Sequence, residues 1–500
     1  MVVAVAAERT DRLYRFEPLD TSGVFLGLGI VQCIALGGGL LIGVSAVTAG
    51  VPLLAAIVPP AIGCGVAFGR VRGQRVWQLA LLGAMWGWRR VRHGTRWTAP
   101  LPLIPTPSGA AAQLPSWLAG LDVVELPWRG TIVIGAVRDR ERHTLTTLVR
   151  VAGPQFVVHP RSDQERLLAS WGDVLNQFAV ERGAVVHVTW SDFAQHSGLH
   201  KHRAWLADVD RGEPNLAADA SYRELLGTAS DVATTHDVVV SITVARDRMA
   251  KRHRDVGSAE VALERLMTSA TESLLRALRS ASLSAGDPLV AGEIHRLLRT
   301  RIEPAATRPR SVGGNLVDRL GLDAPAGAGP LVADTDWRQL RLDGSWHRTW
   351  WVEVWPRLAV PPSWLEGFLS VGGVTRAVTV VFCPVSAHQS RRRIERDLVK
   401  LETDASTKED KGRRIDARHR RATQALLDRE QELVAGFAEM GYVGLVTVTA
   451  TSLEQLEDHA ELVEQLARES GMELRVLDGR QDLGWAAALP IGLAPKSLLA

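Results

Sequence analysis

The chain has 500 residues, which is too long for a single hydrophobic core, and it carries a formal net charge of +3 at pH 7. The charge is unevenly distributed, because residues 97–500 together carry a net charge of −3. A neutral to mildly acidic bulk argues against the broad, salt-dependent nucleic-acid binding that a basic surface gives. We therefore expect roughly two to four domains and no direct binding of nucleic acid.

An uncharged block follows the polar N-terminal segment, residues 1–22. Residues 23–68 contain no charged side chain and form two apolar runs, 23–47 and 51–68, separated by a short turn. A helix of about 20 apolar residues spans a bilayer, and spanning helices tolerate proline such as the pair in the second run. The pattern predicts a transmembrane helical hairpin over 23–68. A buried helical pair in a soluble domain is the alternative.

A basic, tryptophan-rich segment follows over residues 69–97, with seven arginines and no acidic residue. Arginines flanking a span hold that side in the cytoplasm, and a hairpin returns the N-terminal segment to the same side. The apolar part, 76–88, is too short to span a membrane, which favours a helix in the headgroup layer, with a re-entrant segment as the alternative. The residues expected at the membrane interface are Arg70, Arg72, Arg75, Trp77, Trp86, Trp88, Arg89, Arg90 and Arg92.

The remaining sequence predicts a mixed α+β region in two parts. A proline-rich linker at 98–120 leads to a first α+β unit at 121–302, and a second linker at 303–330 leads to a second unit at 331–500. Both units follow a β-β-α-β-α-β order, which predicts two ferredoxin-like folds. A charged stretch at about 386–438 predicts a helical hairpin projecting from the second unit, either as a solvated arm or as a partner contact.

No motif in the chain predicts catalysis. Lys496 and the serine after it come closest to a phosphate-binding loop, but Pro490 and Pro495 stand where that loop requires glycine. Proline has no N–H to donate to a phosphate oxygen. The histidines His196, His200 and His202 are close in sequence, and a solvated polar loop is favoured over a zinc site. We expect no catalytic residue, no metal ligand and no cofactor.

Four tryptophans lie within ten residues of the second unit. On strands they alternate between two faces, so core packing is the default interpretation. A partner-binding aromatic patch is the alternative, because aromatic side chains are enriched at protein interfaces. The residues concerned are Trp346, Trp350, Trp351 and Trp355.

Two parts of the chain resemble proteins of type IV secretion and conjugation machines. The start "YRFEPLDTSGVFLGLGIVQ", the two apolar runs and "RGQRVWQLALLGAMWGWRR" look like the PrgI-type small membrane subunit. The rest, including "WWVEVWPRLAVPPSWLEGFL", "GYVGLVTVTA" and "GRQDLGWAAALPIGL", is similar to the N-terminal, non-catalytic region of TrbE/CagE-type transfer ATPases. In those ATPases a glutamine-containing segment and an LPxG-like turn, here Gln481 and Leu489–Gly492, precede the ATPase core.

Together these stretches look like an actinobacterial family that joins the two pieces and accompanies mobile-element transfer genes. The resemblance implies a non-catalytic scaffold in the cell membrane, which docks a transfer ATPase supplied by another chain and contacts other secretion-channel subunits. The ATPase core is absent from the sequence, so its activity is not carried over. A membrane subunit of a type VII-like secretion complex and a membrane-tethered enzyme are the alternatives, and homo-oligomer formation is left open.

Overall fold

The structure of the chain is a computed structural model. The described residues are 30–71, 74–92, 94–99, 114–153, 156–179, 183–196, 199, 202, 205–206, 208, 216–248, 259–305, 329–358, 360–385, 387–410, 417–434 and 439–493. Predictions for residues 1–29, most of both linkers, Arg72, His200 and the segment after residue 493 lie outside these ranges. The expectation of mixed helix and sheet is confirmed.

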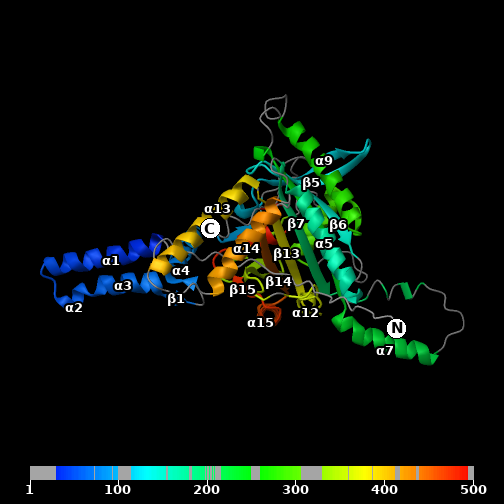
Figure 1. Cartoon of the computed structure of the whole chain (residues 1–500). Helices are drawn as coiled ribbons and strands as arrows, with labels where there is room; N and C mark the ends of the chain where they lie inside the picture. Colours follow the sequence, from blue (N-terminus) through cyan, green and yellow to red (C-terminus); the bar gives the residue numbers. More distant parts are fainter. Residues whose placement is uncertain are drawn as a thin grey trace, which may run out of the picture.

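Three apolar helices form a hairpin of two antiparallel arms at the N-terminal side of the described chain. The first helix is one arm, and the second and third helices make up the other. They are α1 (Ile30–Thr48), α2 (Leu53–Ala56) and α3 (Val58–Phe68). The turn between the two arms contains Gly50, whose positive φ of 81° glycine adopts without steric cost. Figure 1 shows α1 and α3 (blue) side by side and projecting away from the rest of the molecule.

Short strands and a helix connect this pair to the body of the protein. They are β1 (Arg70–Val71), β2 (Gln74–Arg75), α4 (Val76–Val91) and β3 (Arg96–Thr98). The register of β3 places Trp97 opposite Ala333 in the main sheet. Residues 96–98, predicted as the end of the basic segment and the start of the linker, therefore form a strand of the body.

The body is built on one large sheet, of thirteen strands among the described residues, in which every neighbouring pair is antiparallel. Its order is β3-β10-β11-β12-β14-β13-β7-β8-β6-β5-β4, with β15 also on β12 and β9 also on β6. The remaining strands are β4 (Leu121–Trp128), β5 (Ile132–Asp139), β6 (Thr144–Ala152), β7 (Val185–His196), β8 (Thr234–Ala245), β9 (Ser284–Pro288), β10 (Val332–Thr335), β11 (Leu340–Leu342), β12 (Ser345–Val354), β13 (Thr375–Pro384), β14 (Met440–Ala450) and β15 (Glu473–Val476).

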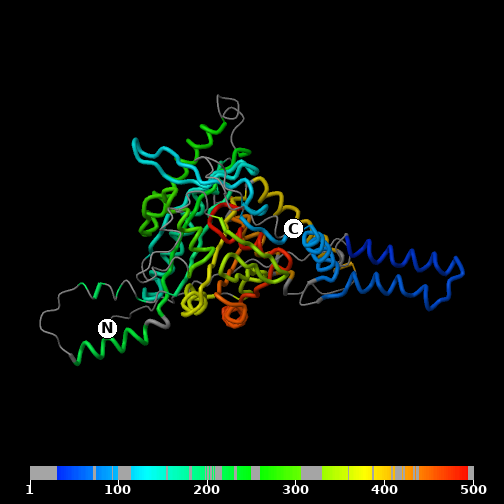
Figure 2. Tube along the Cα trace, turned by 180° about the vertical axis from the view of Figure 1, so that it is seen from behind, coloured from blue at the N-terminus to red at the C-terminus, as the bar shows by residue number. Residues whose placement is uncertain are grey.

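Helices cover both faces of this sheet, and the α1–α3 pair and helix α7 project from the body on opposite sides (Figures 1 and 2). The α-helices of the body are α5 (Arg161–Phe178), α7 (Leu216–Val232), α9 (Ala259–Ser280), α10 (Ala291–Ile302), α12 (Glu366–Leu369), α13 (Ala387–Asp410), α14 (Ala417–Val434), α15 (Leu453–Glu469) and α16 (Gln481–Ala488). Short 3-10 turns occur at Ser116–Leu118, Phe156–Val158 and Arg246–Arg248. The predicted charged helical hairpin is confirmed as α13 and α14, which pack against each other.

One face of the sheet is covered by α5, α9, α12 and α15. Helix α9 buries Leu263, Met267, Leu274 and Leu278, a helical spacing that places them on one side. Trp190 of β7 packs against the cores of both halves, so this face carries a continuous apolar layer.

The other face is covered by α10 and α16, and α16 approaches the sheet closely at Gly484, where an added Cβ atom would lie 3.3 Å from the Thr349 side chain. The Thr379 hydroxyl donates to the carbonyl oxygen of Ala488 at 2.7 Å. The Gln481 side-chain oxygen accepts the Thr349 N–H at 2.8 Å, and its amide nitrogen donates to the Leu477 carbonyl at 3.0 Å. The glutamine singled out by the resemblance is thus fully buried.

The strands assigned to two separate units meet along β7 and β13 in the middle of the sheet. Val378 lies opposite Asp192, and Phe382 lies opposite Val188. Two edge strands that pair satisfy each other's backbone donors and acceptors, which removes two open edges. The observed sheet is therefore continuous and does not separate clearly into the two predicted units.

Candidate functional site

The helical pair α1–α3 is the first part of the candidate site. The stretch Val31–Thr48 of α1 has a mean hydropathy of 1.8 and is long and apolar enough to cross a membrane. Among the described helices it alone meets both conditions, because the apolar stretch Leu53–Phe68 is shorter. One such helix near the N-terminus is compatible with a membrane span by length and composition.

Small residues bring α1 and α3 into close contact. A Cβ atom added to Gly39 would lie 2.7 Å from the Pro59 carbonyl oxygen, and one added to Gly63 would lie 2.7 Å from that of Ala35. The Gln32 side chain, a rare polar group in α1, donates to the Ala67 carbonyl of α3. Small residues and interhelical hydrogen bonds of this kind hold helices together in lipid.

The outward surface of the pair is apolar and exposed. Ile34 is 67% exposed, Leu41 is 69% exposed and Leu54 is 86% exposed. Soluble monomers rarely expose a contiguous apolar surface of this kind, and larger patches mark membrane or protein contacts. The exposed apolar surface of the pair is therefore of the kind that soluble monomers rarely leave open to water.

The Gly39→Leu substitution is expected to disrupt the α1–α3 pair, because the added side chain meets backbone atoms that cannot move aside. Overpacking of this kind costs roughly 1–3 kcal/mol. The aggregation temperature of the full chain in mild detergent should fall by several degrees. Gly37→Leu is the matched control, because a Cβ at Gly37 has no heavy atom within 4 Å. Equal aggregation temperatures for the two variants would contradict the observed packing.

Helix α4 lies between the pair and the body, and one of its sides packs on the body. The Trp86 ring meets the Trp337 ring edge-on, with ring centroids 5.5 Å apart. Arg89 forms an ion pair with Asp482 of α16, whose side chain is 0% exposed. Two residues predicted to face lipid therefore contact the protein instead.

The opposite side of α4 is exposed and apolar. Leu81, Met85 and Trp88 follow at helical spacing and are all exposed, as is Val91. Arg92 stacks on the Trp88 ring at 4.4 Å from its centroid. Leu81 and Met85 were missed by the sequence analysis, although their spacing from Trp88 marks a single helix face.

The other predicted interface residues lie at the start of α4 and at its end. Arg70 and Arg75 are paired positions of β1 and β2, which places two cationic side chains opposite each other. Trp77 is half-buried, and Arg90 is exposed with its guanidinium 4.9 Å from the Trp86 ring centroid. The structure thus brings cations to both ends of the apolar stripe Leu81–Met85–Trp88.

The four tryptophans around β12 pack within the body. Trp350 is 0% exposed, and its Nε1 donates to Glu464 of α15 at 3.0 Å. Trp346, Trp351 and Trp355 are half-buried, and Trp355 meets the Tyr442 ring edge-on at 5.3 Å. Trp350 is therefore a core residue in this conformation, as the default interpretation held.

Buried charges near the seam between β7 and β13 have structural partners. The Arg301 guanidinium lies 3.6 Å from Asp237 and 3.9 Å above the Phe193 ring. Burial lowers the pKa of Arg301 to about 10, opposed by the charge of Asp237, so the side chain stays protonated at neutral pH. Arg376, also buried, donates to the Val371 carbonyl at 2.7 Å and closes the turn after α12.

The predicted histidine cluster is only partly described. His196 ends β7 and lines a cavity of about 260 Å³ together with His459 of α15. His202 lies 2.7 Å from the Tyr222 hydroxyl, away from that cavity. Within the described ranges, no group of three or more histidine, cysteine or acidic side chains is placed to hold a metal ion.

Comparison with known proteins adds no assignment to this geometry. No protein-family model matches the chain, and no curated protein matches it either.

Proposed function

We propose that the chain is a non-catalytic scaffold of a type IV secretion or conjugation-like transfer apparatus. In this proposal α1 and α3 cross the cell membrane as a hairpin, and the N-terminal segment and the body lie in the cytoplasm. The body docks a transfer ATPase encoded by a separate gene. The observation that carries the proposal is the apolar helical pair, in which exposed large apolar side chains such as Ile34, Leu41 and Leu54 lie close together along uncharged helices.

Helix α4 supports an anchoring role. Its exposed stripe Leu81–Met85–Trp88 suits the acyl region just below the headgroups, and Arg90 and Arg92 beside it suit lipid phosphates. Its other side is fixed to the body through Arg89 and Asp482. The membrane anchor and the body are therefore joined through packed side chains as well as through the chain itself.

The strand order supports the predicted pair of ferredoxin-like units within the continuous sheet. In the first half the order β9-β6-β8-β7, with helices α5 and α9 in the crossovers, is that of a ferredoxin-like unit. In the second half the order β15-β12-β14-β13, with α12 and α15, repeats it. We infer two ferredoxin-like units joined edge to edge, with the helical insertions α7 and α13–α14 at the same topological position.

Membrane integration is the first test of the proposal. Full-length chain is expected to remain in the membrane pellet after alkaline carbonate extraction. The double variant Leu40→Arg/Leu41→Arg should move to the supernatant, because each arginine at a helix centre costs about 3 kcal/mol on insertion. Leu358→Arg/Val434→Arg is the matched control, since both of these side chains are highly exposed in the body. Extraction of the wild-type chain by carbonate would contradict the anchoring role.

Partner capture tests the docking role. Chain purified in mild detergent from a host with an intact transfer system is expected to co-elute with an ATPase that carries a complete phosphate-binding loop. The purified ATPase should then bind the purified chain without other components. If no such ATPase co-elutes and none binds in the purified system, the docking role is wrong even if the chain is integral to the membrane.

A further inference from the structure

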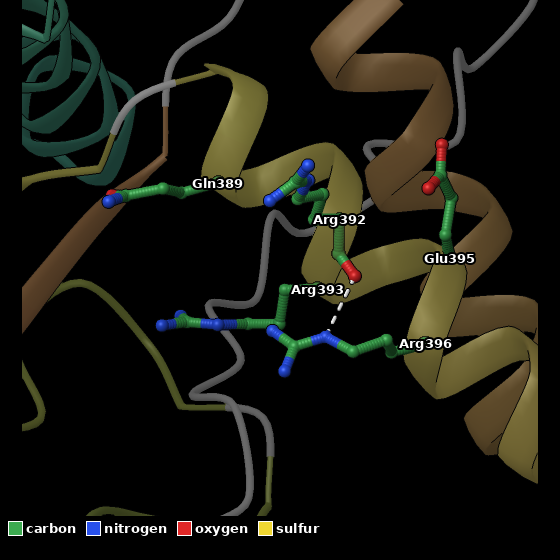
Figure 3. Close-up of a pocket in the computed structure, with 5 residues that line it drawn as sticks. All are labelled: Gln389, Arg392, Arg393, Glu395 and Arg396. Carbon is green, nitrogen blue, oxygen red and sulfur yellow. Dashed lines mark hydrogen bonds between the residues drawn. The ribbon is translucent and has the colours of Figure 1, made fainter.

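Helix α13 presents three arginines to one open hollow. The hollow has a volume of about 750 Å³ and is lined by Gln389, Arg392, Arg393, Glu395 and Arg396. Figure 3 shows the guanidinium groups of the three arginines on one side of α13, with Glu395 turned away from them. The hollow is therefore lined mainly by positive charge.

Two of these arginines have no acidic partner within the described part of the chain. Arg393 forms an ion pair with Glu439 at 3.1 Å, and Glu439 also pairs with Arg429. Arg392 and Arg396 form no ion pair with a described carboxylate, and the Arg396 Nε donates to the backbone oxygen of Arg392 at 3.0 Å. Two guanidinium groups thus share the hollow without an ion-pair partner among the described carboxylates.

An anion between these groups would remove an unfavourable interaction. Like charges four residues apart on a helix repel each other, so the pair Arg392 and Arg396 destabilises α13 when nothing lies between them. The planar guanidinium matches two oxygens of a phosphate group and donates two parallel hydrogen bonds to them. The hydrogen bond from Nε to the Arg392 carbonyl leaves the terminal nitrogens of Arg396 free to donate.

The place of α13 in the fold suggests where such a phosphate comes from. Both views of the molecule show α13 running along the side of the body from which α1 and α3 project, with its far end toward their base (Figures 1 and 2). If α1 and α3 cross the membrane, as proposed above, α13 runs toward the lipid headgroups, and the hollow lies in the half of α13 nearer the sheet. A free phosphate compound could reach the same open hollow from solution.

We propose that Arg392 and Arg396 form a binding site for a phosphate group, carried by an anionic lipid headgroup or by a free phosphate compound. The lipid source rests on the proposed membrane anchoring, whereas the phosphate site itself does not. The two arginines bind the phosphate oxygens, and Gln389 lies at the same hollow as an additional donor or acceptor.

The test uses purified full-length chain in a non-ionic detergent. Binding of phosphatidylglycerol, phosphatidylcholine and inorganic pyrophosphate is measured in parallel with the wild-type chain and with Arg392→Gln/Arg396→Gln. Removal of two positive charges is expected to weaken binding of the anionic probe roughly thirtyfold. Arg276→Gln/Arg279→Gln removes the same charge from two exposed sites on α9 and should leave the affinity unchanged.

Each outcome distinguishes a source or contradicts the site. A loss confined to phosphatidylglycerol supports a lipid headgroup, and a loss confined to pyrophosphate supports a free phosphate compound. Equal affinity of the wild-type chain and the α13 variant for both probes would overturn the proposal.

Two further measurements keep folding and anchoring separate from the site. Arg392→Lys/Arg396→Lys retains both charges but loses the paired hydrogen bonds of the guanidinium, so it should recover part of the affinity and stay weaker than the wild-type chain. The circular dichroism of the glutamine variant should match that of the wild-type chain. Carbonate extraction of the glutamine variant should also be unchanged, so failure of the phosphate site and failure of the membrane anchor give different results.

Discussion

The Arg89→Ala variant is expected to lose about 3 kcal/mol of the free energy of unfolding, because it leaves the carboxylate of Asp482 buried without its ion-pair partner. The Asp482 side chain is 0% exposed, and its other hydrogen bond is from the N–H of Leu483 at 2.9 Å. We take the lower end of the range for broken buried pairs, because the Arg89 side chain is 28% exposed. Urea unfolding of the detergent-solubilised chain, followed by circular dichroism, measures the loss.

Two variants serve as controls for this loss. Arg90→Ala removes an exposed arginine of the same helix that stacks on the Trp86 ring, and it should cost well under 1 kcal/mol. Asp482→Asn in the Arg89→Ala background removes the unpaired buried charge, so it should recover part of the stability. If Arg89→Ala and Arg90→Ala cost the same, the ion pair does not fasten α4 to the body.

The Trp350→Ala variant is expected to lose about 3–5 kcal/mol, the usual cost of deleting a fully buried aromatic side chain. It also leaves Glu464 without the Nε1 donor at 3.0 Å. Urea unfolding of the same detergent-solubilised preparation measures the loss. Trp346→Ala is the comparison, because Trp346 is only half-buried and carries Arg341 over its ring at 5.4 Å from the centroid. Its cost should be distinctly smaller.

The same pair of variants decides between core packing and partner binding for this tryptophan group. A core residue loses stability in the isolated chain, whereas a partner anchor loses affinity and leaves the stability of the isolated chain nearly unchanged. A Trp350→Ala chain that unfolds at the wild-type urea concentration would therefore contradict its assignment to the core.

Elements with a strong local signal were predictable from the sequence. Helix α15 begins after Ser452, whose side chain accepts the Gln455 N–H, and it ends before Gly471 at a positive φ of 76°. Its Leu456, Ala460, Val463 and Ala467 are buried at helical spacing. Capping residues and periodicity were sufficient here, because local and tertiary preferences agree.

Helix α16 was not predicted, because it lacks the signal on which helix prediction depends. Seven of its eight residues are buried, among them Gln481 and Asp482, so it has no polar face to alternate with an apolar one. Strand β9 was also missed, because its own residues give little indication of a strand. Its sequence Ser284–Pro288 has low β propensity, and it pairs with the later part of β6, Val149–Ala152, which lies beyond the residues that pair with β5.

The joining of the two halves and the orientation of α4 depend on contacts between distant parts of the chain. The pairing of Asp192 with Val378 brings together strands that are separated by several other elements, and no local pattern encodes that choice. Composition placed Trp86, Trp88 and Arg89 in one basic segment. It could not tell which of them faces Trp337 and Asp482, because that depends on where the body lies.

The position of α16 bears on the order in which the protein is completed during translation. Helix α1 leaves the ribosome before α16, because the segment that covers part of the second face of the sheet, Gln481–Leu493, comes after all thirteen described strands of that sheet. Until that segment emerges, Thr349 and Thr379 lack the partners that they have in the finished protein. Part of this face therefore stays open until Gln481–Leu493 has been made, and the packing of that segment completes the core that the described residues form there.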